Sequence, residues 1–422
     1  NAWGLVMKRK IYYGWWITLA AFCTFGISTG ISYYNLPFFY DYFEKTYGWT
    51  RADITLGFPL AALLTLWVAP LLAHRFSPRR MILAGTGLIL AAFAGFGNMS
   101  GALWVYYFFW FVYVAGYIFS GPIPHQVIIS QWFRRIRGRA MAVAYVGVAI
   151  GGSAGSYLVK PLAEKFGFQT ALVVLGLMML LAWPLTLWVM KDRPADMGLN
   201  PDGDPEPAPE AREQPRGFGE LLRRPAFWLL AVGSCCSIGS IGAVNQHMKL
   251  VFLDQGFTDQ ERLNAVWRVA SMLTLLSSIA GRLIMGWLAD RYSKKYVMAS
   301  TYLLVSLTIP LLLLVRPAQT YYLYVFAVLF GFGMGADYML IPFMAADQFG
   351  VNTLARAMAI ILPMDTIGQT WFPYLVARLR LHYGDYGHAL TVVFVLAFLG
   401  AVAVLLLPKP RAGTAANAQV GR

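Results

Sequence analysis

Long apolar segments alternate with short polar ones along almost the whole chain. A helix needs about 20 largely apolar residues to cross a hydrocarbon core roughly 30 Å thick. By this criterion the sequence predicts twelve spans, at 12–40, 54–73, 81–98, 102–130, 139–163, 168–190, 226–253, 263–289, 296–315, 320–346, 353–377 and 386–407. Segments of about ten residues with the period-two alternation of a membrane barrel do not occur. We therefore predict an all-α membrane protein.

Composition and charge placement support this class and predict an orientation. The chain is 58% hydrophobic and 13% charged, with a formal net charge of +14. Basic residues gather after every second predicted span, at 8–10, 75–80, 134–139 and 291–295. The positive-inside rule then puts both termini in the cytoplasm of a cell whose inner (plasma) membrane holds the protein. The positive excess is explained by a lipid-facing cytoplasmic rim, so no nucleic-acid partner is predicted.

The spans fall into two halves. A segment rich in proline and carboxylates, 191–224, is predicted to be a cytoplasmic linker between an N-terminal six-helix bundle, 1–190, and a C-terminal bundle, 225–408, followed by a cytoplasmic tail, 409–422. Local similarities recur at offsets of 212 (235 − 23), 216 (286 − 70) and 218 (342 − 124) residues. Slowly drifting offsets favour a duplicated unit. Parallel repeats place a ligand site at their interface, near the middle of the membrane.

Arg282 is the single charge in an apolar run from 269 to 285. A guanidinium stays protonated even in hydrocarbon, so its presence there indicates contact with an anion or with a wet pathway. The alternative is a side chain that reaches the cytoplasmic surface, about 10 Å away along the helix. The residues alone leave both readings open.

Several motifs carry a family resemblance. Gly286, Trp287, Leu288, Ala289, Asp290 and Arg291, with the basic residues after them, resemble the cytoplasmic loop signature of the major facilitator superfamily. The stretches 13–16 and 132–142 are similar to the two signatures of monocarboxylate porters, and the similarity extends along essentially the whole chain. The segments 192–194 and 198–203 also resemble oxalate and formate exchangers.

The resemblance implies a fold and a function. The fold would be the major facilitator fold, with twelve transmembrane helices in two pseudo-symmetric six-helix bundles. The function would be transport of a small monocarboxylate such as lactate or pyruvate with a proton, by alternating access and as a monomer. The alternative is exchange of two carboxylates of the oxalate or formate type. We expect no enzymatic activity, no catalytic residues and no cofactor, because the sequence has no catalytic constellation at a recognisable spacing. We expect no metal, because the three cysteines have no ligand spacing.

The resemblance also implies a substrate site. Arg282 corresponds to the family's carboxylate-binding arginine, whose planar fork suits a carboxylate. Ser278 stands where many members have an aspartate, and Tyr34 and Asn35 stand where many have a lysine. Tyr117 precedes a Ser-Gly-Pro sequence that breaks regular helix, which is typical of backbone lining a cavity.

Because the family's usual aspartate and lysine are missing, other groups are needed to carry a proton. Three residues are candidates. Asp337 and Asp365 lie well inside apolar spans, where they serve either in coupling or in helix-to-helix hydrogen bonds. His247 aligns with Asn35 through the offset of 212, so the two are expected to face each other across the cavity. The neighbours Asn245 and Tyr338 complete the predicted substrate contacts.

The cytoplasmic loops hold the predicted gate. The superfamily resemblance implies that Asp290 forms a latch with arginines nearby, which breaks when the halves rock. Arg291 and Arg79 are the predicted partners in this latch.

Overall fold

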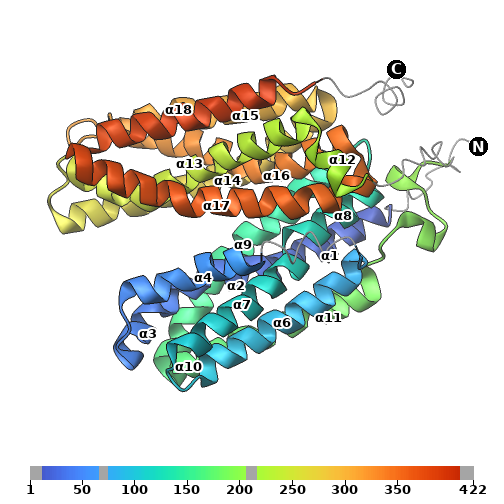
Figure 1. Ribbon diagram of the computed structural model, residues 1–422, viewed down its shortest axis with the longest axis horizontal. Coiled ribbons are helices and arrows are strands. Elements are labelled where there is room, and N and C mark those ends of the chain that lie inside the picture. Colours follow the sequence, from blue (N-terminus) through green and yellow to red (C-terminus); the bar gives the residue numbers. More distant parts are fainter. Residues whose placement is uncertain (1–11, 66–74, 206–215, 409–422) are drawn as a thin grey trace, which may run out of the picture.

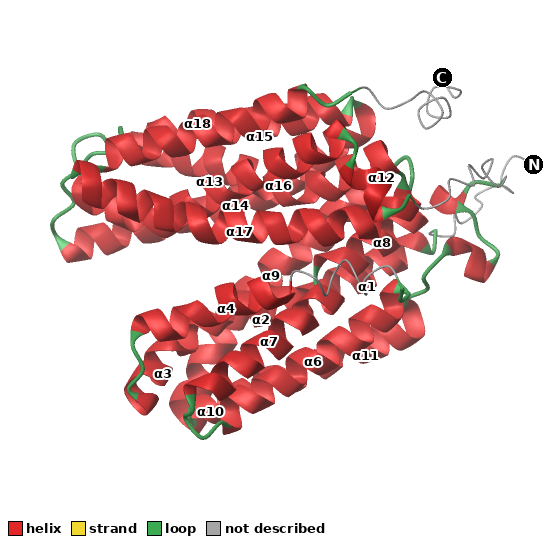
Figure 2. Cartoon of the chain, in the orientation of Figure 1, coloured by secondary structure: helices red, strands yellow, loops and turns green. Residues whose placement is uncertain are grey.

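The computed structural model describes residues 12–65, 75–205 and 216–408, and within these ranges the chain is helical with connecting loops and no strand (Figure 2). The N-terminal bundle consists of α1 (Gly14–Phe25), η1 (Gly26–Ile31), α2 (Ser32–Asn35), η2 (Leu36–Phe39), α3 (Tyr40–Tyr47), α4 (Arg51–Thr65), α6 (Pro78–Asn98), α7 (Leu103–Ser120), α8 (Pro122–Trp132), α9 (Arg137–Phe166), α10 (Phe168–Met178), η3 (Met179–Leu181), α11 (Ala182–Pro184) and η4 (Leu185–Val189). The C-terminal bundle consists of α13 (Pro225–Asp254), α14 (Gln260–Arg291), α15 (Lys294–Leu312), α16 (Tyr321–Phe349), α17 (Val351–Tyr383) and α18 (Tyr386–Leu405).

The helices form two bundles that lie side by side (Figure 1). Within the C-terminal bundle α13 packs on α17 and α18, and α16 packs on α14 and α15. Contacts between the bundles come from α9 with α14 and α16, and from α17 with α4 and α8. The start of α1 and the end of α18 lie at the same end of the molecule, where the bundles meet most closely (Figure 1).

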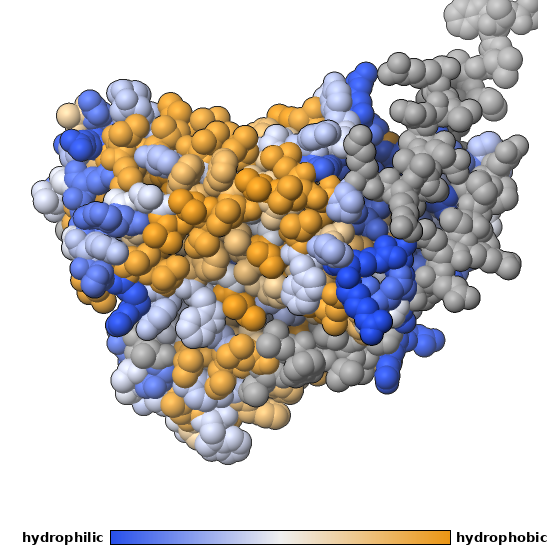
Figure 3. Space-filling view, turned by 45° about the horizontal axis from the view of Figure 1, so that its top comes forward, coloured by the Kyte–Doolittle hydropathy of each residue, from blue (hydrophilic) through white to orange (hydrophobic). Residues whose placement is uncertain are grey.

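The outer surface is built for lipid. Large apolar side chains such as Trp104, Leu276 and Leu399 are exposed. Figure 3 shows a broad apolar band with polar rims at both ends. In the described part of the chain, ten helices are long and apolar enough to cross a membrane. Of the two further predicted spans, α4 is described only to Thr65, and α17 is a helix of 33 residues. The prediction of a multi-pass, all-α membrane protein is confirmed.

The helix α14, which carries Arg282, is fixed at its start and along its length. Asp259 caps it by accepting hydrogen bonds from the backbone N–H groups of Glu261 and Arg262. Further along, Gly281 lies so close to α16 that an added Cβ would be 2.0 Å from the carbonyl oxygen of Phe332. Small residues permit such close helix crossings in membranes. The crossing fixes the direction in which the next residue, Arg282, leaves the helix.

A similar close crossing occurs in the N-terminal bundle. A Cβ on Gly151 would lie 2.3 Å from the carbonyl oxygen of Gly26, so α9 touches η1 backbone to backbone. The widened π turn of η1 lies at this contact.

The linker residues described before 206 lie against the N-terminal bundle, whereas Arg216 bonds to Thr353 of the C-terminal bundle. The carboxylate of Asp202 accepts hydrogen bonds from the backbone N–H groups of Arg134 (3.0 Å) and Arg135 (2.9 Å). The Tyr12 hydroxyl donates to the carbonyl oxygen of Asn200 at 2.9 Å. Short helical turns, Pro194–Met197 and Pro201–Gly203, and α12 (Phe218–Leu222) complete what is described of this segment. The predicted tail, 409–422, lies outside the described residues.

Candidate functional site

Arg282 faces the seam between the two bundles. Its Nη1 donates to the Ser278 hydroxyl, one turn earlier in α14, at 3.0 Å. The side chain thus runs towards the start of α14 and away from its end at Arg291, which the sequence predicts to be cytoplasmic. This conformation therefore excludes the alternative of a side chain that reaches that surface. Its Nε is buried and makes no hydrogen bond to any described residue. No described carboxylate forms an ion pair with it. The guanidinium therefore has donors left for a ligand.

Hydroxyl groups surround this cation. Tyr34 from α2 and Tyr145 from α9 lie within electrostatic reach of Arg282. Tyr34 is 59% exposed although protein surrounds it, so it lines an open cavity rather than the outer surface. The Tyr145 hydroxyl accepts a hydrogen bond from Gln126 Nε2 at 2.5 Å. Both tyrosines belong to the N-terminal bundle, whereas Arg282 belongs to the C-terminal one, so the cluster spans the seam.

Tyr117 and Tyr338 extend the cluster of hydroxyls. The ring of Tyr117 in α7 lies 5.6 Å from that of Tyr33, centroid to centroid. Tyr338 in α16 donates to Gln369 Oε1 at 3.1 Å and lies within electrostatic reach of Tyr117 and Tyr34. The structure thus brings together four predicted groups, Arg282, Tyr34, Tyr117 and Tyr338.

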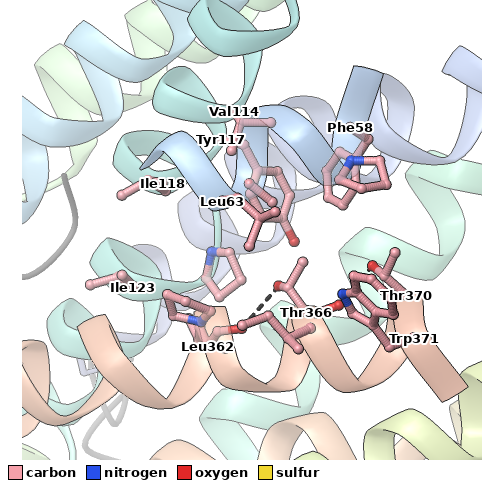
Figure 4. A pocket seen from close by; sticks show the side chains of 15 residues that line it. Phe58, Leu63, Val114, Tyr117, Ile118, Ile123, Leu362, Thr366, Thr370 and Trp371 are labelled. Atoms are coloured by element: carbon pink, nitrogen blue, oxygen red, sulfur yellow. Dashed lines mark hydrogen bonds between the residues drawn. The ribbon is translucent and has the colours of Figure 1, made fainter. Parts of the chain in front are cut away.

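An apolar pocket adjoins the cluster at Tyr117 (Figure 4). It lies between α4, α7 and α8 of one bundle and α17 of the other, and encloses about 690 Å³, including its open mouth. The Tyr117 hydroxyl points into it, towards Thr366 (Figure 4). The Thr366 hydroxyl donates to the carbonyl oxygen of Leu362 at 2.9 Å, so it offers only an acceptor to the pocket. The remaining walls are mostly hydrocarbon.

Asp337 and Asp365 lie together inside the C-terminal bundle. Both side chains are fully buried. Asp337 Oδ2 accepts a hydrogen bond from the Ser237 hydroxyl, and Asp365 Oδ1 accepts one from the Ser234 hydroxyl at 2.6 Å. The other oxygen of each carboxyl group makes no hydrogen bond to a described residue. The Tyr302 hydroxyl lies beside Asp337, but its geometry does not make it a hydrogen-bond partner.

His247 is buried and fully satisfied as a neutral ring. Its Nε2 lies 2.9 Å from the carbonyl oxygen of Pro373, which can only accept, and its Nδ1 lies 3.2 Å from the Tyr386 hydroxyl, which can donate. All three groups belong to the C-terminal bundle. Asn245, two residues earlier, is exposed and donates to Met334 Sδ at 3.2 Å.

Asn35 does not meet His247 as the repeat offset predicts. Its Nδ2 donates to the carbonyl oxygens of Ile31 (2.9 Å) and Gly152 (3.3 Å), so it ties α2 to α9 within the N-terminal bundle. The two residues are each used inside their own half. In this conformation they are helix-to-helix ties rather than facing cavity groups.

Asp290 joins the two halves at the end of α14. Its carboxylate accepts hydrogen bonds from the backbone N–H groups of Gly138 (2.6 Å) and Arg139 (3.0 Å), at the first turn of α9, and from Arg139 Nε at 3.2 Å. A carboxylate at a helix N-terminus also meets the positive end of the helix dipole. The closeness of the helices permits this contact, because a Cβ on Gly138 would be 2.3 Å from the carbonyl oxygen of Gly286.

The other two predicted gating residues do not bridge the seam. Arg79 donates from its backbone N–H to Asp192 at 2.9 Å and from Nε to the carbonyl oxygen of Thr186 at 2.9 Å, both in the N-terminal half. Arg291 lies over the ring of Trp287, 5.4 Å from the centroid. The partner of Asp290 is Arg139, which sequence reasoning noted only as part of a basic segment.

His125 was also missed, as were the serines that hold the acids. His125 is 1% exposed and stacks on Phe25 at 4.7 Å. Its Nδ1 lies 2.7 Å from the carbonyl oxygen of Gly121, and its Nε2 lies 2.8 Å from the Thr24 hydroxyl. The available signal was its position after the Gly-Pro break at which α8 begins.

Comparisons with solved structures identify the arrangement of the helices. The Escherichia coli fucose:proton symporter FucP superposes with a TM-score of 0.69 at 13% identity, covering 93% of this chain and 98% of that chain. A second structure of FucP, in the outward conformation, gives a TM-score of 0.69 at 14% identity, covering 94% and 99%. At 13–14% identity these superpositions show the fold of the chain.

The sequence comparisons supply the family. The model of the Major Facilitator Superfamily matches residues 122–283 and 265–422, so the chain belongs to the major facilitator superfamily. Human monocarboxylate transporter 11 is 25% identical over 94% of this chain and 83% of its own length. Monocarboxylate transporter 12 of Xenopus laevis is 24% identical over 91% and 85%. Mouse monocarboxylate transporter 11 is 26% identical over 66% of this chain, which spans only 60% of that relative's length.

These findings confirm the predicted twelve-helix fold and the resemblance to monocarboxylate transporters. Membrane sensor protein UhpC of Salmonella typhimurium is 25% identical over 57% of both chains, so the level of identity does not separate the monocarboxylate transporters from a relative named as a sensor. The substrate therefore has to be argued from the site.

Proposed function

We propose that this protein carries small monocarboxylates, such as lactate and pyruvate, together with a proton across the inner membrane. The observation that carries the proposal is the Arg282 side chain, half-buried at the seam with a buried, unpartnered Nε and no described counter-ion. A buried cation costs several kcal/mol to desolvate unless a negative group compensates it. A carboxylate that accepts two parallel hydrogen bonds from the fork is the ligand that suits it.

The hydroxyl groups complete this proposed site. Tyr34 and Tyr145 lie within electrostatic reach of the guanidinium, and Tyr338 stands across the seam from Tyr117. Neutral hydroxyls donate to carboxylate oxygens without neutralising Arg282 in the empty state. The apolar walls beside Tyr117 receive the short hydrocarbon body of the substrate. Asn245 and Asn35 are weaker candidates for substrate contact, because each makes its hydrogen bonds within its own bundle.

Alternating access follows from how the bundles are joined. Asp290 binds α9 at one end of the seam, while Tyr34 is exposed to a cavity. In our proposal this end is cytoplasmic, with both termini, and the conformation opens to the outside. Breaking the Asp290 contacts lets the bundles rock about the site as rigid units, within a single monomer.

Proton coupling makes the cycle of an anion carrier electrically neutral, since each charge moved across 100 mV costs about 2.3 kcal/mol. The acids Asp337 and Asp365 are the proposed proton carriers. His247 is the weakest of the three predicted candidates, because its neutral ring already satisfies both neighbours.

The test is uptake of labelled lactate and pyruvate into proteoliposomes, with and without an inward proton gradient. We expect uptake that the gradient accelerates. No uptake would reject the substrate class, equal rates would reject coupling, and uptake that requires carboxylate inside the vesicles would show an exchanger of the oxalate or formate type.

Arg282→Lys is the sharpest variant in this assay. It keeps the charge but loses the planar fork, and we expect uptake to fall roughly 10-fold to 100-fold, the equivalent of one or two charged hydrogen bonds. Arg316→Lys, at an exposed arginine in the loop between α15 and α16, is the matched control and should transport normally. Normal transport by Arg282→Lys would remove Arg282 from the site.

A further inference from the structure

Asp337 and Asp365 meet one face of one helix. Their serine partners, Ser237 and Ser234, are three residues apart on α13, so they are neighbours on its surface, roughly 5–6 Å apart. The carboxyl groups come from two other helices, α16 and α17, and lie within electrostatic reach of each other. They therefore form one buried unit that ties three helices together.

Among the residues that the structure describes, no cation compensates this unit. The groups that act on the two carboxyls, apart from each other, are the hydroxyls of Ser234, Ser237 and Tyr302. The further titratable neighbours of Asp365 are the Cys235 thiol and Tyr338 in the same bundle, and Tyr145 across the seam. Like charges buried this close together cannot both remain ionised, so the pair must hold at least one proton or a bound cation.

The hydrogen bonds distinguish the two acids. The Ser237 hydroxyl has a single proton to donate, and among the described residues its one acceptor is Asp337. Asp337 therefore accepts this hydrogen bond as an ionised carboxylate. Ser234 has two acceptors in reach, Asp365 Oδ1 at 2.6 Å and the carbonyl oxygen of Ala231 at 3.1 Å. Asp365 can therefore be neutral. It then donates from Oδ1 to Ser234, which donates in turn to Ala231.

We propose that Asp337 and Asp365 form an acid pair that holds a single proton, resident on Asp365, and that this proton is the one transported. This inference rests on the proposed symport and assigns its proton site. Release requires water to reach the pair: the O–H bond of Asp365 then breaks, and the proton passes to that water, which also screens the two carboxylates. The Ser234 hydroxyl turns from Ala231 to donate to the new carboxylate. Reloading reverses both movements, so charge and atoms balance.

Tyr145 connects the pair to the substrate site. It lies within electrostatic reach of both Arg282 and Asp365. An empty, cationic Arg282 favours the Asp365 carboxylate. When a substrate anion neutralises Arg282, that support is lost and Asp365 holds its proton more tightly. Anion and proton binding then favour each other, which is the linkage that symport requires.

The first test is infrared spectroscopy of the purified protein at neutral pH, which does not depend on any substrate. We expect the C=O band of a buried neutral carboxyl group, lost in Asp365→Asn and retained in Asp337→Asn. A band that survives in Asp365→Asn, or that is missing from the parent protein, would overturn the assignment. The band should be the same in sodium and in choline salts, and its loss in sodium would show a metal-cation site instead.

Ser234→Ala covers the case in which the asparagine variants fold poorly. It removes only the acceptor of the Asp365 proton, so the carboxyl band should remain but shift to the position of a group without a hydrogen bond. An unshifted band would contradict the proposed relay. Ser240→Ala, which removes a hydroxyl bonded only to backbone carbonyl oxygens in α13 and α18, is the matched control.

The second test is transport. In Asp365→Asn, uptake driven by a proton gradient should fall to the rate without a gradient, while exchange of labelled for unlabelled carboxylate continues. Persisting gradient-driven uptake would overturn the proton site. If the parent protein moves no carboxylate at all, the proposed substrate is wrong, and the infrared bands still decide whether the pair holds its proton.

Discussion

The two bundles share an architecture but bury different chemistry. The sequence Arg-Ala-Met-Ala occurs at 139–142 and again at 356–359, an offset of 217 (356 − 139) that places Val148 opposite Asp365. The offset of 218 from the Ile-Pro pairs places Phe119 opposite Asp337. The C-terminal bundle thus has buried acids where the N-terminal bundle has apolar side chains.

Apart from Arg137 at the start of α9, the buried polar side chains of the N-terminal bundle are neutral. Four of them, those of Thr29, Trp110, Gln126 and Ser130, keep an unpaired atom. Others are paired. The His125 ring bonds to the Thr24 hydroxyl and to a backbone carbonyl oxygen, the Ser28 hydroxyl donates to a backbone carbonyl oxygen, and the Tyr113 hydroxyl bonds to another hydroxyl. In the C-terminal bundle, Arg282 and both acids keep unpaired polar atoms. Unpaired buried groups lower stability and persist where function uses them. The difference assigns charge chemistry to one half and makes the other a wall that supplies hydroxyls across the seam.

The largest expected effect comes from exchanging these interiors. Val148→Asp should destabilise the protein by about 3 kcal/mol, the cost of an acid inside the membrane without a prepared partner. Asp365→Val should instead raise the thermal stability. It removes a carboxyl oxygen without a partner, and it leaves Ser234 bonded to Ala231. Thermal unfolding in detergent should therefore show a lower unfolding temperature for Val148→Asp and a higher one for Asp365→Val than for the parent protein.

Asp337→Asn is the control for that comparison, since it keeps the volume of a side chain whose serine partner can still donate. Equal unfolding temperatures for Val148→Asp and the parent protein would show that the N-terminal interior accepts an acid as readily as the C-terminal one. The proposed division between the bundles would then fail.

The next effect concerns the contact that holds the bundles together. Asp290→Asn loses the charge that accepts from Gly138 and Arg139, worth about 1.5–3 kcal/mol. The population open at this end should rise roughly 10-fold to 100-fold. A cysteine placed at Ala142, buried against Gly286, should react with maleimide correspondingly faster.

An ion pair within one bundle provides the control. Lys294 donates to Asp347 at 2.6 Å, and both residues lie in the C-terminal half. Asp347→Asn in the same cysteine background should leave the labelling rate unchanged, because rigid bundles do not exchange this contact when they rock. Equal acceleration by both substitutions would indicate general loosening instead of a gate.

How far the sequence predicts this molecule depends on the distance over which its signals act. The spans follow from local hydropathy, and Arg282 is evident because a lone charge contrasts with its own neighbours. Asp337 and Asp365 were predictable as buried acids for the same reason. Their serine partners lie 100 and 131 residues away along the chain, and serine is too common within spans for the pairing to be recognised without coordinates.

The expectation for Asn35 and His247 shows a different limit. An offset between repeats aligns positions along two helices but does not fix the faces on which they lie. The π-helical η1, Gly26–Ile31, precedes Asn35, whereas α13 is a continuous α-helix through His247. A π turn holds more residues than an α turn, so it rotates the residues that follow it. Asn35 consequently faces Gly152 of its own bundle.

The smallest expected effect tests whether the N-terminal bundle takes any part in proton coupling. In His125, Nδ1 faces a carbonyl oxygen and therefore carries the proton, so Nε2 accepts from Thr24 and the ring is neutral. His125→Gln should lower stability by about 1 kcal/mol, the net worth of one hydrogen bond, and should leave the pH profile of uptake superimposed on that of the parent protein. Thr24→Val, which removes one of the same bonds without removing a titratable group, should match it in stability. A shifted pH profile in His125→Gln but not in Thr24→Val would place a second proton carrier in the N-terminal half, and the contrast between a charged bundle and a neutral one would no longer describe how the protein works.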